Sequence, residues 1–96
     1  MPKVFSAQGG ADAIEIFKKH HETIDLVILD IIMPQMGGGE VFDRLKQVSP
    51  QVKVLLSSGY SIDGEASKIM ARGCNGFIQK PFDILQLSQS IMAILK

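Results

Sequence analysis

The sequence has little of several features on which common protein classes depend. Its 96 residues include one cysteine, Cys74, and no tryptophan, so an internal disulfide and a cysteine-rich metal site are both excluded. Ten basic residues balance ten acidic ones, which excludes an overall basic surface of the kind that binds nucleic acid. The longest apolar stretch, residues 26–36, contains Asp30 and is too short to span a membrane. No apolar signal region follows Met1.

The remaining composition is that of an ordinary globular protein. Hydrophobic residues make up 46% of the chain and charged residues 21%, which distinguishes it from a disordered segment. A chain of this length forms one small domain, and a lone cysteine is typical of a reducing compartment. We therefore expect a single domain over residues 1–96 in the cytoplasm, with no direct nucleic-acid contact, no membrane contact and no output domain.

Short apolar runs alternate along the chain with stretches of helical periodicity. The runs predict strands at residues 3–6, 25–30, 52–56 and 76–79. Apolar residues at helical spacing predict helices at residues 11–21, 40–47 and 63–72, and a last helix after a cap at Asp83. This order predicts an α/β fold, with four helices on both faces of a parallel sheet of four strands.

Polar side chains lie at or just after the ends of the last three predicted strands. Asp30 ends the second strand, Ser57 and Ser58 follow the third, and Lys80 follows the fourth. In parallel sheets the chemistry lies beyond the carboxyl ends of the strands. A carboxylate, a hydroxyl and an ammonium at this edge suit phosphoryl transfer: the carboxylate acts as nucleophile, while the other two groups bind and neutralise the phosphoryl oxygens.

Each of these residues also has a simpler interpretation. An aspartate after a strand is often a turn or helix cap, a Ser-Ser-Gly sequence is a common turn, and a lysine before proline is usually solvated. The joint placement of Asp30, Ser58 and Lys80 therefore carries more weight than any one of them.

Three segments of the chain resemble motifs of one family, the CheY-like receiver domains of two-component response regulators. Residues 25–38 are similar to the phosphoacceptor segment, residues 54–60 to the strand that bears a Ser or Thr, and residues 76–82 to the Lys-Pro strand. The spacings, 28 residues from Asp30 to Ser58 and 22 from Ser58 to Lys80, also agree with the family. The resemblance covers essentially the whole chain and implies a flavodoxin-like fold.

The resemblance assigns a role to each matching residue. Asp30 would accept a phosphoryl group from a histidine kinase or a phosphotransfer protein, Ser58 would bond that group, and Lys80 would pair with the acyl phosphate. Asp30 and the backbone carbonyl of Ile32 would be Mg²⁺ ligands, and Phe77 would be the aromatic switch. Such a phosphoprotein is a signalling domain rather than an enzyme, although the family catalyses its own phosphotransfer and dephosphorylation.

Three further positions have structural roles in the resembled family. The Lys80–Pro81 bond resembles one that is cis, and Pro34 and Gly38 belong to the loop that follows the phosphoacceptor. In the family, the last strand and last helix form a face that pairs with partners or with a second copy. The resemblance therefore implies homo-oligomer formation through this face as one mode of association.

The chain departs from the family at its beginning. Residues 4–7 align with the second strand of the family, so the first strand, the first helix and the acidic pair that holds Mg²⁺ are absent. We therefore expect an amino-terminally truncated receiver in which Mg²⁺ binding is weak or absent. Loss of a central strand from a 2-1-3-4-5 sheet leaves unpaired edges, which predicts a strand-pairing oligomer, a rearranged sheet, or a fragment of a longer protein.

Two alternative functions remain open on the residues. A pseudo-receiver or truncated protein-interaction module that is never phosphorylated would keep the fold, and the missing acidic pair favours it, whereas the intact Asp30, Ser58 and Lys80 do not. Haloacid-dehalogenase-type phosphatases also combine Asp, Ser or Thr and Lys on an α/β sheet. They need a second aspartate two positions after the nucleophile, and this chain has Ile32 there.

Overall fold

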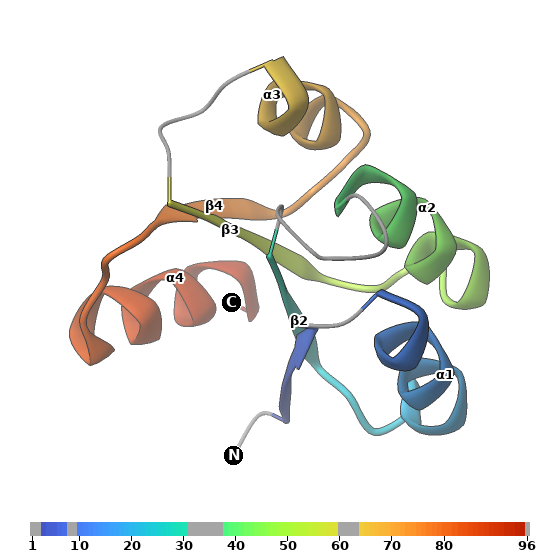
Figure 1. Cartoon of the computed structure of the whole chain (residues 1–96). Helices are drawn as coiled ribbons and strands as arrows, with labels where there is room; N and C mark the ends of the chain where they lie inside the picture. The colour runs from blue at the N-terminus through green and yellow to red at the C-terminus, as the bar shows by residue number, and fades with distance from the viewer. Residues whose placement is uncertain (1–2, 8–9, 31–37, 60–63, 96) are drawn as a thin grey trace.

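Strands and helices alternate along the chain in the computed structural model, which describes residues 3–7, 10–30, 38–59 and 64–95 (Figure 1). The elements are β1 (Val4–Ala7), α1 (Gly10–His20), β2 (Leu26–Asp30), α2 (Gly38–Val48), β3 (Val54–Ser58), α3 (Gly64–Ala71), β4 (Gly76–Gln79) and α4 (Ile84–Leu95). The predicted α/β fold of four strands and four helices is confirmed.

The four strands form one parallel sheet in the order β1-β2-β3-β4. Strand β1 pairs directly with β2, from Val4 opposite Leu26 to Ala7 opposite Leu29. In the 2-1-3-4-5 order that the resemblance implied, another strand would separate these two. The described sheet is therefore continuous, which corresponds to the rearranged sheet among the three expectations.

The helices cover the two faces of the sheet unequally. Helices α1, α2 and α3 lie on one face, and α4 lies alone on the other (Figure 1). The larger core cluster contains side chains of the first three helices, and the predicted inward positions Val41, Phe42 and Leu45 of α2 are all buried in it. Their spacing keeps them on one side of the helix, so that side faces the sheet.

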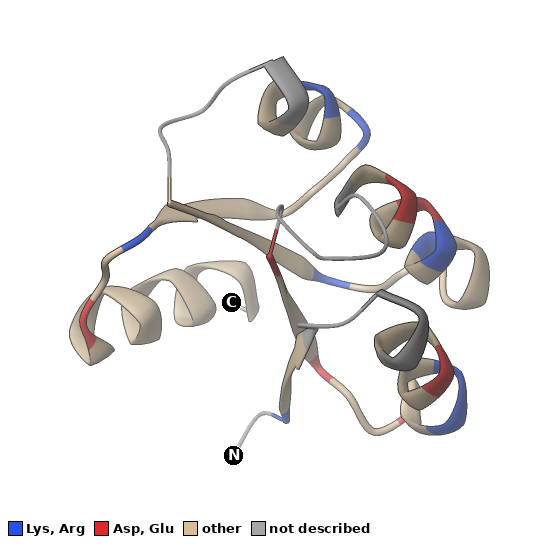
Figure 2. Ribbon diagram, in the orientation of Figure 1, with Lys and Arg blue, Asp and Glu red and all other residues tan. Residues whose placement is uncertain are grey.

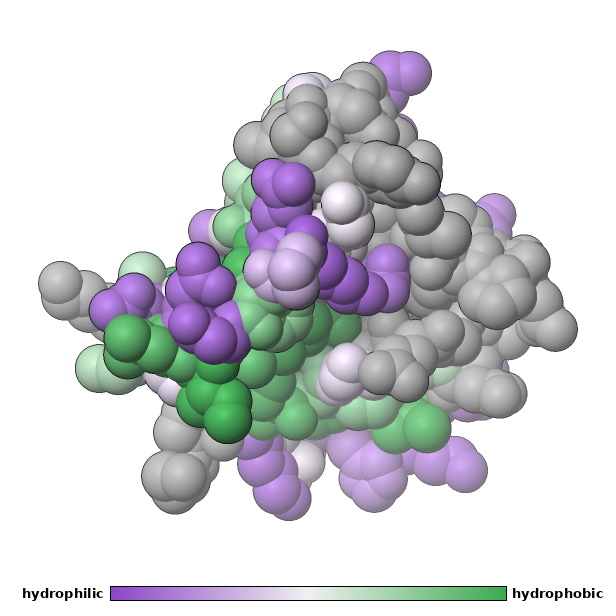
Figure 3. Space-filling model, turned by 60° about the vertical axis from the view of Figure 1, so that its left-hand side comes forward, coloured by the Kyte–Doolittle hydropathy of each residue, from purple (hydrophilic) through white to green (hydrophobic). Residues whose placement is uncertain are grey.

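Helix α4 packs on a smaller cluster formed by Leu26, Leu55 and Ile78. Its predicted inward residues Leu87 and Ile91 pack there, only partly buried. The helix carries no charged side chain (Figure 2), and the apolar side chains of Ile84, Leu85 and Met92 on it are exposed. Figure 3 shows apolar side chains gathered on this side of the molecule.

Local hydrogen bonds explain where several elements begin and end. Asp83 and Gln86 cap α4 reciprocally: the Asp83 backbone N–H donates to Gln86 Oε1 at 3.1 Å, and the Gln86 backbone N–H donates to Asp83 Oδ1 at 2.7 Å. Gly73, the predicted stop after α3, has a φ of 106°, which glycine adopts without steric cost. The predicted cap at Asp63 lies outside the described residues.

The predicted bounds of the third strand, residues 52–56, are wrong by two residues. The backbone N–H of Val52 donates to Ser49 O at 3.0 Å and so closes the turn after α2. Pairing with β4 instead carries the strand on to Ser57 and Ser58. Both serines therefore belong to the buried strand and not to the turn that follows it.

None of the helices in the described part of the chain combines the length and the apolar character that a bilayer crossing requires.

Candidate functional site

Asp30 and Lys80 meet at the carboxyl edge of the sheet. Asp30 is the last residue of β2, and Lys80 directly follows β4. The Lys80 Nζ atom lies 2.6 Å from Asp30 Oδ2, and the Lys80 backbone N–H donates to Ser58 O at 2.6 Å. The side chains are 27% exposed for Asp30 and 44% for Lys80, so both are partly accessible from solvent.

The two serines at the end of β3 lie on different faces of the sheet. Ser57 is the register partner of Asp30 on β2, and side chains of register partners point to the same face. Ser58 is the next residue, so its side chain points to the opposite face. Both serines are only 2% exposed. The sequence analysis selected Ser58 for the site. The register of β3 places the side chain of Ser57, and not that of Ser58, on the same face of the sheet as Asp30.

A cavity of about 300 Å³ opens beside the Asp30–Lys80 pair on the α4 side of the sheet. Its lining brings a carboxylate, an ammonium and hydroxyl groups together with apolar side chains. The lining residues are Ser6, Ile28, Asp30, Ser57, Lys80, Phe82 and Leu87. Ser6, Phe82 and Leu87 were not selected from the sequence, because their proximity to Asp30 depends on how β1 and α4 dock on the sheet.

The other expected site positions are placed as follows. Phe77, in β4, is partly buried and packs against the larger core cluster. The Lys80–Pro81 peptide bond is cis, and Gly38 is the first residue of α2. Ile32 and Pro34 lie outside the described residues.

The metal-binding capacity of the described residues is small. They contain no group of three or more His, Cys, Asp or Glu side chains that could hold an ion. Asp30 supplies the one carboxylate that lines the cavity, and the Oδ2 atom of this carboxylate forms an ion pair with Lys80 Nζ. Mg²⁺ is commonly bound through one or two carboxylates together with phosphate oxygens and water. The donor set therefore fits a weak site that a phosphoryl group would help to complete.

Cys74 is a buried thiol that lies just before β4 and does not line the cavity beside Asp30. It is 8% exposed, and its Sγ donates to Val54 O at 3.3 Å. Burial raises the pKa of the Cys74 thiol, and hydrogen bonds with the backbone oppose this effect in part. The prediction that Cys74 is a small packed residue agrees with this environment.

The raised pKa and burial of Cys74 predict slow alkylation of the folded protein. At about pH 8 we expect iodoacetamide to modify Cys74 of the folded protein at least roughly tenfold more slowly than Cys74 of the protein unfolded in guanidinium. Folding lowers both the fraction of the thiol that is ionised and the access of the reagent to the sulfur atom. Mass spectrometry of timed samples measures the two rates. Equal rates would contradict the buried position.

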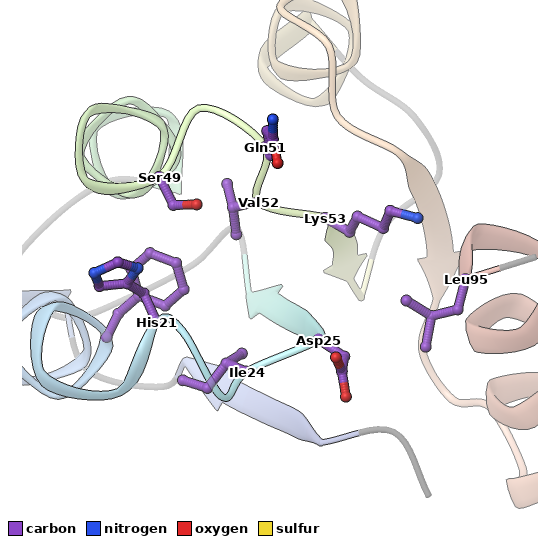
Figure 4. A pocket seen from close by; sticks show the side chains of 9 residues that line it. His21, Ile24, Asp25, Ser49, Gln51, Val52, Lys53 and Leu95 are labelled. Atoms are coloured by element: carbon purple, nitrogen blue, oxygen red, sulfur yellow. The ribbon is translucent and has the colours of Figure 1, made fainter.

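A second cavity, of about 640 Å³, lies at the opposite, amino-terminal edge of the sheet. Figure 4 shows its lining, which includes His21, Ser49 and Gln51. Its two charged side chains have partners already: Asp25 Oδ2 accepts from the Lys3 backbone at 2.7 Å, and Lys53 Nζ donates to Ile94 O at 3.4 Å. This larger cavity is remote from Asp30, and the candidate site is therefore the smaller one.

Known proteins are similar to this chain over most of its length. Sensor kinase CckA of Brucella abortus (strain 2308) is 32% identical over 93 residues, which cover 97% of this chain and 10% of the kinase. Chemotaxis protein CheY of Bacillus subtilis (strain 168) is 32% identical over 88 residues, which cover 92% of this chain and 72% of CheY. The chain thus spans most of CheY and about a tenth of the kinase.

Solved structures share the fold. A response regulator receiver domain protein from Clostridium thermocellum superposes with a TM-score of 0.90 at 20% identity, over 99% of this chain and 94% of that one. A chain of the CheX–CheY–BeF3–Mg complex from Borrelia burgdorferi gives a TM-score of 0.84 at 27% identity, over 92% of this chain and 66% of that one.

The family model for the response regulator receiver domain matches residues 1–92. This match agrees with the flavodoxin-like parallel sheet and with the similarity to CheY. The chain therefore belongs to the response regulator receiver domain family.

Proposed function

We propose that the chain is a phosphoacceptor of a two-component phosphorelay and that Asp30 takes a phosphoryl group from a phosphohistidine. The contact of 2.6 Å between Lys80 Nζ and Asp30 Oδ2 at the carboxyl edge of the sheet is the observation that carries this proposal. An Asp30 oxygen attacks phosphorus, the P–N bond of the donor breaks, and an acyl phosphate forms. The leaving imidazole keeps the bond electrons and takes up a proton.

The neighbouring residues act through charge and hydrogen bonding. Lys80 neutralises charge on the transferred group, as an ammonium does at other phosphoryl-transfer sites. Ser58 bonds the phosphoryl group once it is present, and Asp30 and the Ile32 carbonyl hold Mg²⁺ weakly. When bound, Mg²⁺ supplies further neutralisation of the phosphoryl oxygens.

Signal output passes through the end of the sheet in this proposal. A bond from Ser58 to the phosphoryl group changes the packing at the end of β3, and Phe77 on the adjacent β4 turns further inward. Ser58 and Phe77 lie on neighbouring strands, since Ser58 pairs with Gln79 and Leu56 with Phe77. A partner that reads the last strand and last helix would sense this change.

The partners follow from the chemistry of the site. A histidine kinase or a phosphotransfer protein supplies the phosphoryl group, which accords with similarity to the sensor kinases CckA and LuxN. In this proposal the chain is a signalling domain whose chemistry is limited to its own phosphorylation and dephosphorylation. Its place is the cytoplasm, where such donors are found.

Phosphoryl uptake by the purified chain tests the proposal. After incubation with acetyl phosphate and Mg²⁺, we expect intact-mass spectrometry to show the addition of one phosphoryl group. The addition should be smaller without Mg²⁺ and absent in Asp30→Asn, because that variant keeps the side-chain shape but lacks the nucleophilic carboxylate.

The Asp30→Asn variant controls for phosphorylation elsewhere in the chain. An equal added mass in Asp30→Asn would place the modification on another residue and overturn the proposal. Circular dichroism must show that both samples are folded, so that a lack of uptake reports on the site.

A second candidate is a protein-interaction module that is not phosphorylated. The exposed apolar residues of α4 favour it, since Ile84 is 82% and Met92 71% exposed on a helix without charges. A contact through this face is also the mode of homo-oligomer formation that the resemblance implied. Absence of added mass on a folded sample would select this second function.

A further inference from the structure

Ser57 carries a buried hydroxyl group that has no role in the phosphoryl transfer proposed above. The residue is 2% exposed, and its Oγ atom finds no hydrogen-bond partner among the described residues. Buried polar atoms are almost always paired. The unpaired hydroxyl of Ser57 therefore suggests a hydrogen-bond acceptor that is supplied by a ligand.

The position of Ser57 indicates which ligand this is. Ser57 and Asp30 are register partners on adjacent parallel strands, whose axes lie about 4.8 Å apart. Both side chains line the cavity of about 300 Å³ on the α4 side. Ile28, Phe82 and Leu87 of the same lining offer no side-chain acceptor, and Ser6 adds one further hydroxyl. A group attached to Asp30 is therefore well placed to accept a hydrogen bond from the Ser57 hydroxyl.

The charge of the cavity selects an anionic group. Lys80 lies over the same edge, with its Nζ atom against Asp30 Oδ2, so an ammonium and an unpaired hydroxyl line the cavity beside one carboxylate. Phosphoryl oxygens accept hydrogen bonds from such groups strongly, because they are charged. The hydroxyl of Ser58, on the opposite face of the sheet, would approach the same group from its other side.

We propose that Ser57 is a second hydroxyl donor for the phosphoryl group on Asp30, and that it orients this group toward the cavity beneath α4. The inference rests on the proposed function of Asp30. It adds a contact on the α4 face, which Ser58 cannot supply from its own face of the sheet.

This role predicts effects of opposite sign on binding and on stability. Ser57→Ala removes a donor to a charged group, so affinity for a phosphoryl analogue should fall roughly tenfold or more. The same change removes a buried hydroxyl that lacks a partner in the free protein, so the unfolding midpoint should stay unchanged or rise. A purely structural role would lower both quantities together.

Beryllofluoride, a tetrahedral phosphoryl analogue, is the probe. We would titrate it in the presence of Mg²⁺ into the wild-type chain, Ser57→Ala and Ser57→Thr, and follow binding by fluorine NMR and unfolding by urea. Ser57→Thr keeps the hydroxyl and should bind within about threefold of the wild-type chain, since the donor remains. Ser88→Ala removes an exposed hydroxyl of α4 and serves as the matched control.

Each outcome decides the inference. Weaker binding by Ser57→Ala, with recovery in Ser57→Thr and no loss of stability, would support it. Equal binding by the wild-type chain and Ser57→Ala would overturn it and leave the role of Asp30 intact. A parallel loss of binding and stability would assign Ser57 to packing alone. A wild-type chain that binds no beryllofluoride and takes up no phosphoryl group would overturn both proposals.

Discussion

Phe42→Ala is expected to lower the free energy of unfolding by about 3–5 kcal/mol. The Phe42 ring is 1% exposed and belongs to the cluster beneath α1, α2 and α3. Its removal leaves a cavity that neighbouring side chains fill only in part. Small domains have total stabilities of about 5–15 kcal/mol, so this one substitution removes a large part of the margin.

Urea unfolding followed by circular dichroism measures this effect. Met92→Ala is the matched control, because Met92 is 71% exposed on α4 and its truncation should change the stability by no more than about 0.5 kcal/mol. If both variants lost the same stability, Met92 would be covered in solution and the outer side of α4 would be an interface.

Lys80→Met should reduce the rate of phosphoryl uptake by about 10²–10³-fold, the usual effect of removing one donor to a developing oxyanion. Methionine keeps most of the side-chain length and loses the ammonium that lies 2.6 Å from Asp30 Oδ2. The fold should change little in stability, by at most about 1 kcal/mol, because the Lys80 side chain is 44% exposed and exposed ion pairs contribute little.

Timed intact-mass spectra with acetyl phosphate give the rate for Lys80→Met. Lys18→Met is the matched control, since it removes the same charge from an exposed pair on α1, where Nζ lies 3.6 Å from Glu15 Oε1. Equal rates in the two variants would mean that net charge, and not the position of the Lys80 ammonium, governs uptake.

The sequence alone predicted the elements well where local chemistry sets their limits. β4 was predicted with its observed bounds, Gly76–Gln79, because a glycine precedes its apolar residues and Lys80-Pro81 ends the run. β3 was placed two residues early. Val52 continues the apolar run but takes part in the turn after α2, and periodicity alone cannot separate a buried turn residue from a strand residue.

The candidate site was predicted in part for a similar reason. That Asp30 and Lys80 meet follows from parallel strands whose carboxyl ends share an edge. The choice between Ser57 and Ser58 depends on the register between β2 and β3, and a shift of one residue exchanges the faces. No local pattern fixes that register, because β3 is buried along its whole length and so lacks the alternation of polar and apolar residues.

The order of the strands also has a consequence for folding kinetics. Each strand pairs with the next one in the chain, and the first bridged residues of the three pairs are separated by 22, 27 and 21 positions (Val4–Leu26, Val27–Val54 and Leu55–Gly76). Loop-closure entropy grows only with the logarithm of loop length, by about 0.6 kcal/mol for each doubling. The three closures therefore cost nearly the same, and the sheet can grow by one strand–helix unit at a time from any of its pairs.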